Sequence, residues 1–128
     1  IKAAQKAEKA EKKYPEVEKK PEITIDDFDK VQIQVGEVIK CEPVPKAKKL
    51  LVSQIKIGAE TRQIVSGIAK YYKPEEMVGK KVAVITNLKP CKLCGVESQG
   101  MILAAGDDEG NLSVVTVDKD IVSGSEIC

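Results

Sequence analysis

The sequence of 128 residues contains no histidine and no tryptophan, and its aromatic side chains are three tyrosines and one phenylalanine. Without histidine, the most frequent general base and the usual nitrogen ligand of zinc are missing, so catalysis would depend on cysteine, lysine or carboxylates. Proteins that stack single-stranded bases use aromatic side chains, which contribute about 1–3 kcal/mol each. The scarcity of aromatics therefore argues against that binding mode, and we expect Phe28 to lie in the core.

The chain also lacks an excess of charge of one sign, because its formal net charge is +1. The charges are nevertheless unevenly placed: residues 40–92 hold 12 basic and 4 acidic side chains, whereas residues 93–128 hold 1 basic and 7 acidic ones. A positive region of this kind attracts a polyanion, and an acidic remainder keeps the polyanion off the wrong face. No apolar run approaches the length of a membrane span, so we expect no membrane partner.

Cysteine is sparse as well, with four residues and no signal-peptide pattern, which favours reduced thiols in a cytoplasmic protein over a disulfide framework. Cys91-x-x-Cys94 is half of a zinc site, but Cys41 and Cys128 lack the paired spacing that would complete it. A redox pair would normally open a helix, whereas Gly95 and a strand follow here. We favour ordinary cysteines with no metal and no cofactor. A zinc- or thiol-dependent enzyme is the alternative, which metal analysis would decide.

The first 22 residues are almost entirely Lys, Glu, Ala and Pro, without a large apolar stripe. This composition predicts a solvated helix or linker over residues 1–22, interrupted at Pro15 and Pro21. The globular domain is expected over residues 23–128. Because the chain starts at Ile1 instead of methionine, we expect a processed product or a piece of a longer protein.

From residue 31 onward the apolar residues alternate with period two, as in strands. A bulge or bend is expected at Gly36, where the alternation changes parity. Further strands are predicted at 51–57, 62–68, 81–88, 101–105 and 112–117, with a short helix at 74–78. This order predicts an all-β fold, a five-stranded OB-fold barrel with a short helix between strands 3 and 4 and an added C-terminal β arm.

Basic residues occupy the loops of this predicted barrel. Lys46, Lys48 and Lys49 precede the second strand, Arg62 opens the third, and Lys89 and Lys92 follow the fourth. In an OB barrel these loops converge on one mouth, where cations would contact phosphates with little base specificity. Folded RNA suits this chain, because lysine, Asn87, Ser98 and Gln99 can meet its backbone without stacking. A basic rim that serves only solubility is the alternative.

Three motifs occur in order: Gln63–Ile68, Asn87–Pro90 and Ser98–Ala104, with Pro74–Lys81 between the first two. Together they resemble the tRNA-binding domain family shared by C-terminal regions of bacterial methionyl-tRNA synthetases, stand-alone tRNA-binding proteins and the endothelial-monocyte-activating polypeptide. The resemblance covers residues 23–128. It implies an OB fold, sequence-tolerant tRNA binding and homodimerisation through the strands added after the barrel. The preceding segment is similar to the linker that tethers such a domain to upstream catalytic domains.

The resemblance also assigns residues. Asn87, Lys89, Ser98, Gly100 and Met101 match the family's signature, and Arg62 matches its basic position before the third strand. Gly100 and Met101 could instead serve the packing of the barrel. Gln32, Gln34 and Cys94 depart from the family pattern. The loss of positive charge at Gln34 and Cys94 weakens the expected RNA binding and leaves dimerisation untouched.

These features predict a non-catalytic, dimeric tRNA-binding module of a synthetase, with the chemistry in other domains. The predicted tRNA contacts are Lys46, Lys48, Lys49, Arg62, Asn87, Lys89, Lys92, Ser98, Gln99 and Met101. The predicted dimer interface is Leu112, Val114, Val115 and Val117, because apolar side chains in the final arm need a partner surface. The alternatives are a stand-alone dimeric tRNA-binding protein and a dimerisation domain whose RNA binding is weak.

Overall fold

The computed structural model describes residues 14–128, so the predicted linker or helix over residues 1–22 lies partly outside the described range. Residues 14–24 have no helix or strand, and their side chains are exposed. They lead into helix α2 (Ile25–Phe28), where the Thr24 hydroxyl accepts the Asp27 N–H at 3.2 Å as an N-cap. The predicted domain boundary at residue 23 stays a prediction.

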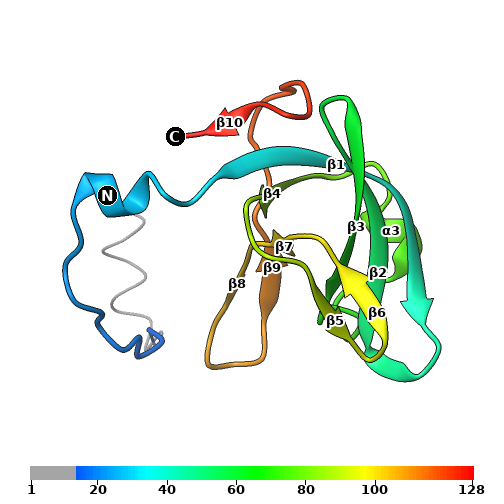
Figure 1. Ribbon diagram of the computed structural model, residues 1–128. Helices are drawn as coiled ribbons and strands as arrows, with labels where there is room; N and C mark the ends of the chain where they lie inside the picture. Colours follow the sequence, from blue (N-terminus) through cyan, green and yellow to red (C-terminus); the bar gives the residue numbers. More distant parts are fainter. Residues whose placement is uncertain (1–13) are drawn as a thin grey trace.

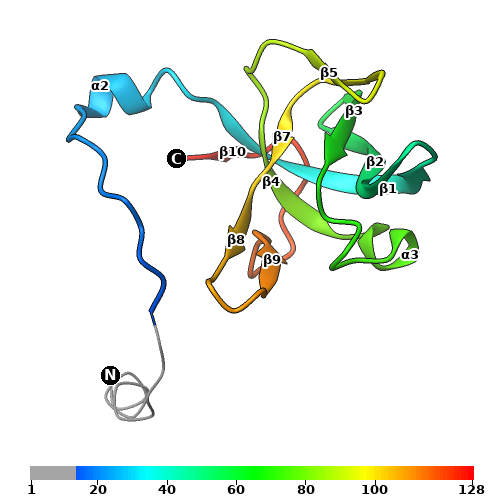
Figure 2. The same cartoon turned by 90° about the horizontal axis from the view of Figure 1, so that it is seen from below.

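Helix α2 stands clear of the sheet in both views (Figures 1 and 2) and buries none of its residues. The expectation that Phe28 lies in the core is therefore wrong, since its side chain is 39% exposed. The residue lies on a single helical turn that stands outside the barrel, which period-two alternation of the strands could not indicate.

The remaining elements are short strands around one helix. They are β1 (Ile33–Val44), β2 (Ala47–Ile57), β3 (Glu60–Ser66), α3 (Pro74–Met77), β4 (Lys81–Ile85), β5 (Cys91–Leu93), β6 (Val96–Ser98), β7 (Met101–Ile102), β8 (Ala104–Gly106), β9 (Leu112–Val114) and β10 (Glu126–Ile127). The main sheet runs in the order β3-β2-β1-β4-β7, with antiparallel neighbours. Hydrogen bonds between β3 and residues 98–99 join its two ends. The predicted OB-like barrel is confirmed.

The C-terminal arm is also present. Strand β9 pairs with β8, and β10 returns to pair with Ile33 and Gln34 at the start of β1. Between them, the Val115 N–H donates to the Leu103 carbonyl and the Val115 carbonyl accepts from Ala83, both at 2.9 Å. The arm, orange to red in Figure 1, is thus hydrogen-bonded to β1 and β4, which lie inside the order of the main sheet.

The core follows from the alternation along the strands. On β2, Leu51, Ser53 and Ile55 point inward and are each 1% exposed or less. Helix α3 closes one end of the barrel by inserting Met77, which is fully buried. Pro74 starts this helix, where its missing N–H costs nothing. The body that carries the loops therefore has a continuous buried core.

Gly36 has a different role from the one expected. The register of β1 is continuous there, with Gly36 opposite Val82, and the irregularity lies between Val38 and Lys40. A Cβ at Gly36 would lie 2.5 Å from the Cγ2 of Ile55. The glycine is required because β2 packs closely against this point of β1, not because the strand bends there.

Residues 89–100, which lie between the strands predicted at 81–88 and 101–105, contain a hairpin that the sequence reasoning missed. Strands β5 and β6 pair from Cys91 opposite Ser98 to Leu93 opposite Val96. Cys94 and Gly95 form its two-residue turn with positive φ angles of 52° and 81°. Both angles match a type I′ turn, the common two-residue link of a hairpin. A well-formed hairpin therefore carries Lys92, and Lys89 lies just before it.

Candidate nucleic-acid interface

Two hairpin tips meet at one end of the barrel. The turn between β1 and β2, at Pro45 and Lys46, and the turn between β5 and β6, at Cys94 and Gly95, line a common cleft of about 280 Å³. Figure 1 shows both turns on the same side, below the barrel. Two of the loops that were expected to converge are therefore adjacent.

The predicted phosphate-binding lysines lie on or beside these hairpins and are all exposed: Lys46, Lys48, Lys49, Lys89 and Lys92. Among the ion pairs of residues 14–128, none involves these five lysines. Lys48 and Lys49 are consecutive on β2, so their side chains leave opposite faces of the strand. The ammonium groups are thus available to an external anion.

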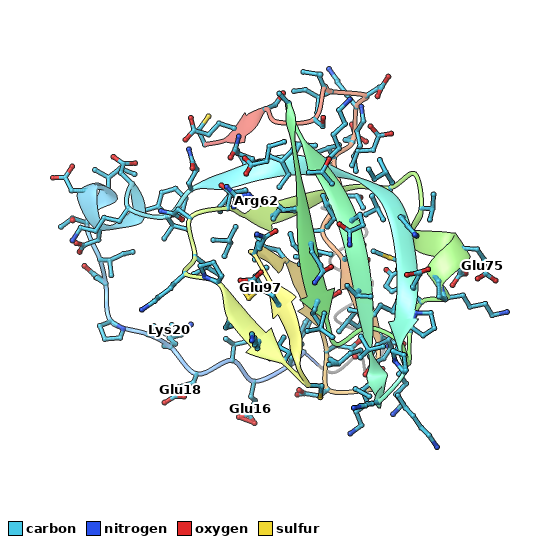
Figure 3. The ribbon with its side chains drawn as sticks, turned by 45° about the vertical axis from the view of Figure 1, so that its right-hand side comes forward. Glu16, Glu18, Lys20, Arg62, Glu75 and Glu97 are labelled. Carbon is cyan, nitrogen blue, oxygen red and sulfur yellow. The ribbon has the colours of Figure 1, made fainter. Side chains whose placement is uncertain are left out.

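Arg62 is engaged inside the protein. Its Nη1 donates to the carbonyl oxygens of Thr86 and Gln99, and its Nε donates to Glu60 at 3.1 Å. The side chain, labelled in Figure 3, is 24% exposed, and its hydrogen bonds join β3 to the segments just after β4 and just after β6. Its predicted contact with tRNA stays a prediction. In the structure, the guanidinium group holds β3 to the neighbouring segments of the barrel.

Ser98 and Gln99 form part of the same closure. The buried Ser98 hydroxyl accepts the Val65 N–H at 2.9 Å and donates to the Gly100 carbonyl at 3.0 Å. The Gln99 N–H donates to the Gln63 carbonyl at 2.7 Å, and its Oε1 accepts the Gln63 N–H at 3.1 Å. These hydrogen bonds position the β5–β6 hairpin against β3. Whether either residue also touches RNA stays a prediction.

Asn87 is exposed, but both ends of its amide have partners. Its Nδ2 donates to the Lys30 carbonyl at 2.6 Å, and its Oδ1 accepts the Gln32 N–H at 2.9 Å. The amide therefore joins the end of β4 to the segment that follows α2. Its predicted role as a tRNA contact stays a prediction.

Lys89 and Met101 line a larger cavity of about 480 Å³ between β3, the β5–β6 hairpin and β8. Leu88 and Leu93, which sequence reasoning did not select, are on the same wall. The strand predicted over residues 81–88 ended at Leu88 and left Leu93 outside any strand, so the period-two alternation gave no reason to place the two leucines around one cavity. Met101 was expected to contact tRNA or to pack in the barrel, and the structure places it in the lining of this cavity.

The predicted dimer residues differ from one another in burial. Val114 is 4% exposed and belongs to the core of the chain itself, against which Leu112 is packed. Val115 is 40% exposed, and Val117 is half-buried. Within this set, Val115 offers the largest apolar surface to a partner. The interface as a whole stays a prediction.

The four cysteines do not gather. Burial raises the pKa of the Cys41 thiol, although a hydrogen bond from Ser53 opposes this, so Cys41 is a poor nucleophile. Cys91, Cys94 and Cys128 are exposed. In the described part of the chain, no group of three or more Cys, His, Asp or Glu side chains is placed to hold a metal ion. Nor does any helix in residues 14–128 have the length and apolarity to cross a membrane.

A closed OB-like barrel with adjacent loops rich in unpaired lysines defines a nucleic-acid-binding module. Residues 33–126 match the family described as "Putative tRNA binding domain". The chain belongs to this family, which confirms the resemblance seen in its motifs.

The relatives support the same assignment. The methionine–tRNA ligase of Methanocaldococcus jannaschii is 61% identical over 110 residues, which are 86% of this chain and 17% of that protein. Methionine–tRNA ligase 1 of Bacillus anthracis is 55% identical over 121 residues, which are 94% of this chain and 18% of that protein. This chain thus spans less than a fifth of the length of these relatives. A crystal structure of a MetRS-related protein from Pyrococcus horikoshii superposes with a TM-score of 0.81 at 38% identity, over 85% of this chain and 100% of that one.

Proposed function

We propose that the chain is a non-catalytic module that binds tRNA with little sequence specificity and assists aminoacylation by a methionine–tRNA ligase. The observation that carries the proposal is the group of five exposed lysines without ion pairs on or beside the two hairpins. Lysine contacts phosphate as a point charge, which gives affinity but little sequence readout. The family and the relatives identify tRNA as the polyanion.

The proposed benefit to a synthetase arises from tethering. A module joined to upstream catalytic domains by residues 1–22 would raise the local concentration of tRNA near the active site in the cytoplasm. Even micromolar affinity would then improve capture of tRNA. The alternative of a stand-alone tRNA-binding protein is favoured by the Pyrococcus horikoshii protein, which this chain covers in full. The length of the reading frame upstream of residue 1 discriminates between the two.

The test of RNA binding is a titration of tRNA against the chain at increasing salt. We expect binding at low salt whose affinity falls steeply as salt rises, because bound lysines release counterions from the phosphates. An mRNA-derived stem-loop of similar length should bind within a few-fold of tRNA if sequence has little influence. Absence of binding at low salt, or an affinity indifferent to salt, would reject the proposed function.

We also propose that the module acts as a homodimer. Exposed apolar side chains support this: around α2, Ile25 is 70%, Phe28 39% and Val31 40% exposed, and in the C-terminal arm Val115 is 40% and Val122 72% exposed. Helix α2 has no fully buried residue within the chain, so a partner surface would explain why it carries Phe28. Isologous pairing would bury each of these patches on both protomers.

Sedimentation tests the dimer with two point variants in place of a truncation, since β10 and Val114 are needed by the barrel itself. Phe28→Ser and Val115→Glu should shift the chain toward monomer without changing its thermal stability per chain. Glu75→Gln on α3, at the end of the molecule opposite α2 (Figure 3), is the control. A monomer at all concentrations for the unmodified chain would reject dimerisation and leave tRNA binding standing.

A further inference from the structure

The cavity of about 480 Å³ beside the β5–β6 hairpin is lined by large apolar side chains, whose exposure to water is unfavourable. Leu88 is 44% exposed, Leu93 39% and Met101 45%, and all three line this one cavity. Leucine at single surface positions needs no explanation, but three large apolar side chains around one hollow form a ligand surface. Its volume lies within the range of small-molecule sites, about 300–1,000 Å³.

The cavity also holds a polar group without a partner. The Ser66 side chain lines it, and the Ser66 hydroxyl is buried without any hydrogen-bond partner in residues 14–128. The Ser98 hydroxyl, on the same wall, is fully used by Val65 and Gly100. A buried hydroxyl that lacks a partner is unfavourable. A ligand whose polar edge reached Ser66 would remove that penalty.

Positive charge stands at the rim of this apolar hollow. Lys89 lines the cavity, whereas Lys92 lies between the cavity-lining Cys91 and Leu93 on β5, so its side chain leaves the opposite face of that strand. Neither lysine has an ion pair among the described residues. An apolar peptide would use the walls but not Lys89, whereas a nucleotide has both a flat, weakly hydrated base and an anionic phosphate. The charge therefore favours a nucleotide.

We propose that this cavity is a subsite for one unpaired nucleobase of bound tRNA, with Met101 and Leu93 against the faces of the base and Ser66 at its hydrogen-bonding edge. Lys89 contacts the adjoining phosphate. The proposal rests on the proposed tRNA binding and adds to it a contact with a base. Aliphatic walls replace the aromatic platform, and this is how a chain so poor in aromatics holds an unstacked base.

The two methionines provide a direct test. In the full chain labelled with ¹³C at the methionine methyl groups, Met101 lies in the cavity, whereas Met77 is fully buried in the core and serves as internal reference. On addition of tRNA, the ring current of a stacked base should move the Met101 methyl resonance upfield and leave Met77 in place. Inorganic polyphosphate, which has phosphates but no bases, should bind the lysines without moving either resonance. Equal responses to tRNA and polyphosphate would overturn the base subsite.

A matched pair of variants tests the same subsite by filling it. Ala104 and Ala105 are neighbours on β8 and both exposed, but Ala104 lines the cavity and Ala105 does not. Ala104→Phe should weaken tRNA binding about tenfold, the loss expected when one base loses its stacking contacts, without changing the salt dependence. Ala105→Phe should bind tRNA normally.

The outcomes separate the two proposals. If the unmodified chain fails to bind tRNA, the proposed function fails. If it binds tRNA and both phenylalanine variants bind equally well, the lysines suffice and the base subsite is rejected while the function stands. If Ala104→Phe abolishes a dimer in sedimentation but leaves tRNA affinity unchanged, the cavity holds a second copy of the chain, which also overturns the base subsite.

Discussion

The turns of the β5–β6 and β8–β9 hairpins lie in opposite electrostatic surroundings. The β5–β6 hairpin is itself neutral, because Lys92 stands opposite Glu97, but its turn meets Lys46 on the β1–β2 hairpin. The turn of β8–β9 carries Asp107, Asp108 and Glu109. A polyanion is attracted to the lysines beside the first turn and repelled by the second turn. The pair can therefore orient a bound RNA as well as attract it.

The hairpins also differ in how they are held. The β8–β9 hairpin is rooted in the core by Val114, whose N–H donates to the Tyr72 hydroxyl at 3.0 Å. The β5–β6 hairpin is held by polar contacts, including the Gln63 amide, which donates to the Glu97 carbonyl at 2.8 Å. The hydrogen bond between Val65 and the Ser98 hydroxyl at the base of this hairpin is buried, whereas the one from Gln63 to Glu97 is exposed, so the part of the hairpin beyond Ser98 opens more readily than its base. The more adaptable part of the hairpin thus includes the turn that meets Lys46.

The largest effect is expected from reversing the charge of the three lysines at the start of the β1–β2 hairpin's second strand and in its turn. Lys46→Glu, Lys48→Glu and Lys49→Glu together should weaken tRNA binding about 100-fold or more at about 50 mM salt, with a shallower salt dependence, because three phosphate contacts become repulsive. Fluorescence anisotropy with labelled tRNA measures both quantities.

The control changes the same net charge elsewhere. Lys19, Lys56 and Lys119 lie on the N-terminal segment, on β2 near the β2–β3 turn and in the C-terminal arm, and all are exposed. Their replacement by glutamate should weaken binding only slightly. Equal losses in the two triple variants would show that overall charge, and not the basic hairpin tips, determines affinity.

A smaller loss is expected when the anchor of the β5–β6 hairpin is cut. Arg62→Met leaves the carbonyls of Thr86 and Gln99 without their donor and should lower the free energy of unfolding by about 1–3 kcal/mol in urea titrations. Lys40→Met, at a surface ion pair of 3.9 Å, should change it little.

The salt dependence of tRNA binding shows what else Arg62 does. If Arg62 only positions the hairpin, Arg62→Met weakens binding without changing the salt slope. A slope reduced by about one would instead show that the guanidinium contacts a phosphate.

Much of the barrel followed from the sequence because its strands are half-buried and alternate. The hairpin over Leu51–Ile57, the helix at Pro74 and the order of strands were all predicted and are confirmed. The β5–β6 hairpin was missed because each of its strands has three residues, too few for an alternating pattern to emerge. Strand β10 was missed for the same reason.

The site was harder to predict than the fold. The loops of an OB barrel converge, so the exposure of Lys46 and its position beside the β5–β6 turn could be expected. The hydrogen bonds that Arg62 and Asn87 make within the protein could not be expected, because the sequence does not show which backbone carbonyl a polar side chain will meet. Residues far apart along the chain, such as Ser66 and Leu93, form one cavity only after the barrel closes.

A modest gain is expected from neutralising the acidic hairpin. Asp108→Asn and Glu109→Gln together should raise tRNA affinity a few-fold at low salt, and the gain should vanish near physiological salt, where the Debye length is about 8 Å. Asp107 is left intact because its carboxylate holds the turn. Unchanged affinity at low salt would show that this hairpin lies too far from the RNA to repel it.

The smallest effect is expected in the β8–β9 turn when the Asp107 carboxyl becomes protonated. Hydrogen bonds from the Asn111 side chain, and from the N–H groups of Asn111 and Glu109, lower the pKa of the exposed Asp107 carboxyl. A lowered folded pKa means that the ionised carboxylate stabilises the turn above its unfolded pKa of about 3.9, and that this contribution is lost as the pH falls through the lowered value.

Amide NMR can follow this loss residue by residue. Between about pH 4 and pH 2, the protection of the Glu109 and Asn111 amides against exchange should fall, so that their rates approach the intrinsic rate, while the protection of the Val96 amide beside the Cys94–Gly95 turn should persist, since no carboxylate holds that turn. Asp107→Asn should remove the pH dependence at both amides. A parallel loss at Val96 would mean that the acid opens the whole barrel, and the two hairpins would then not differ in how their turns are held.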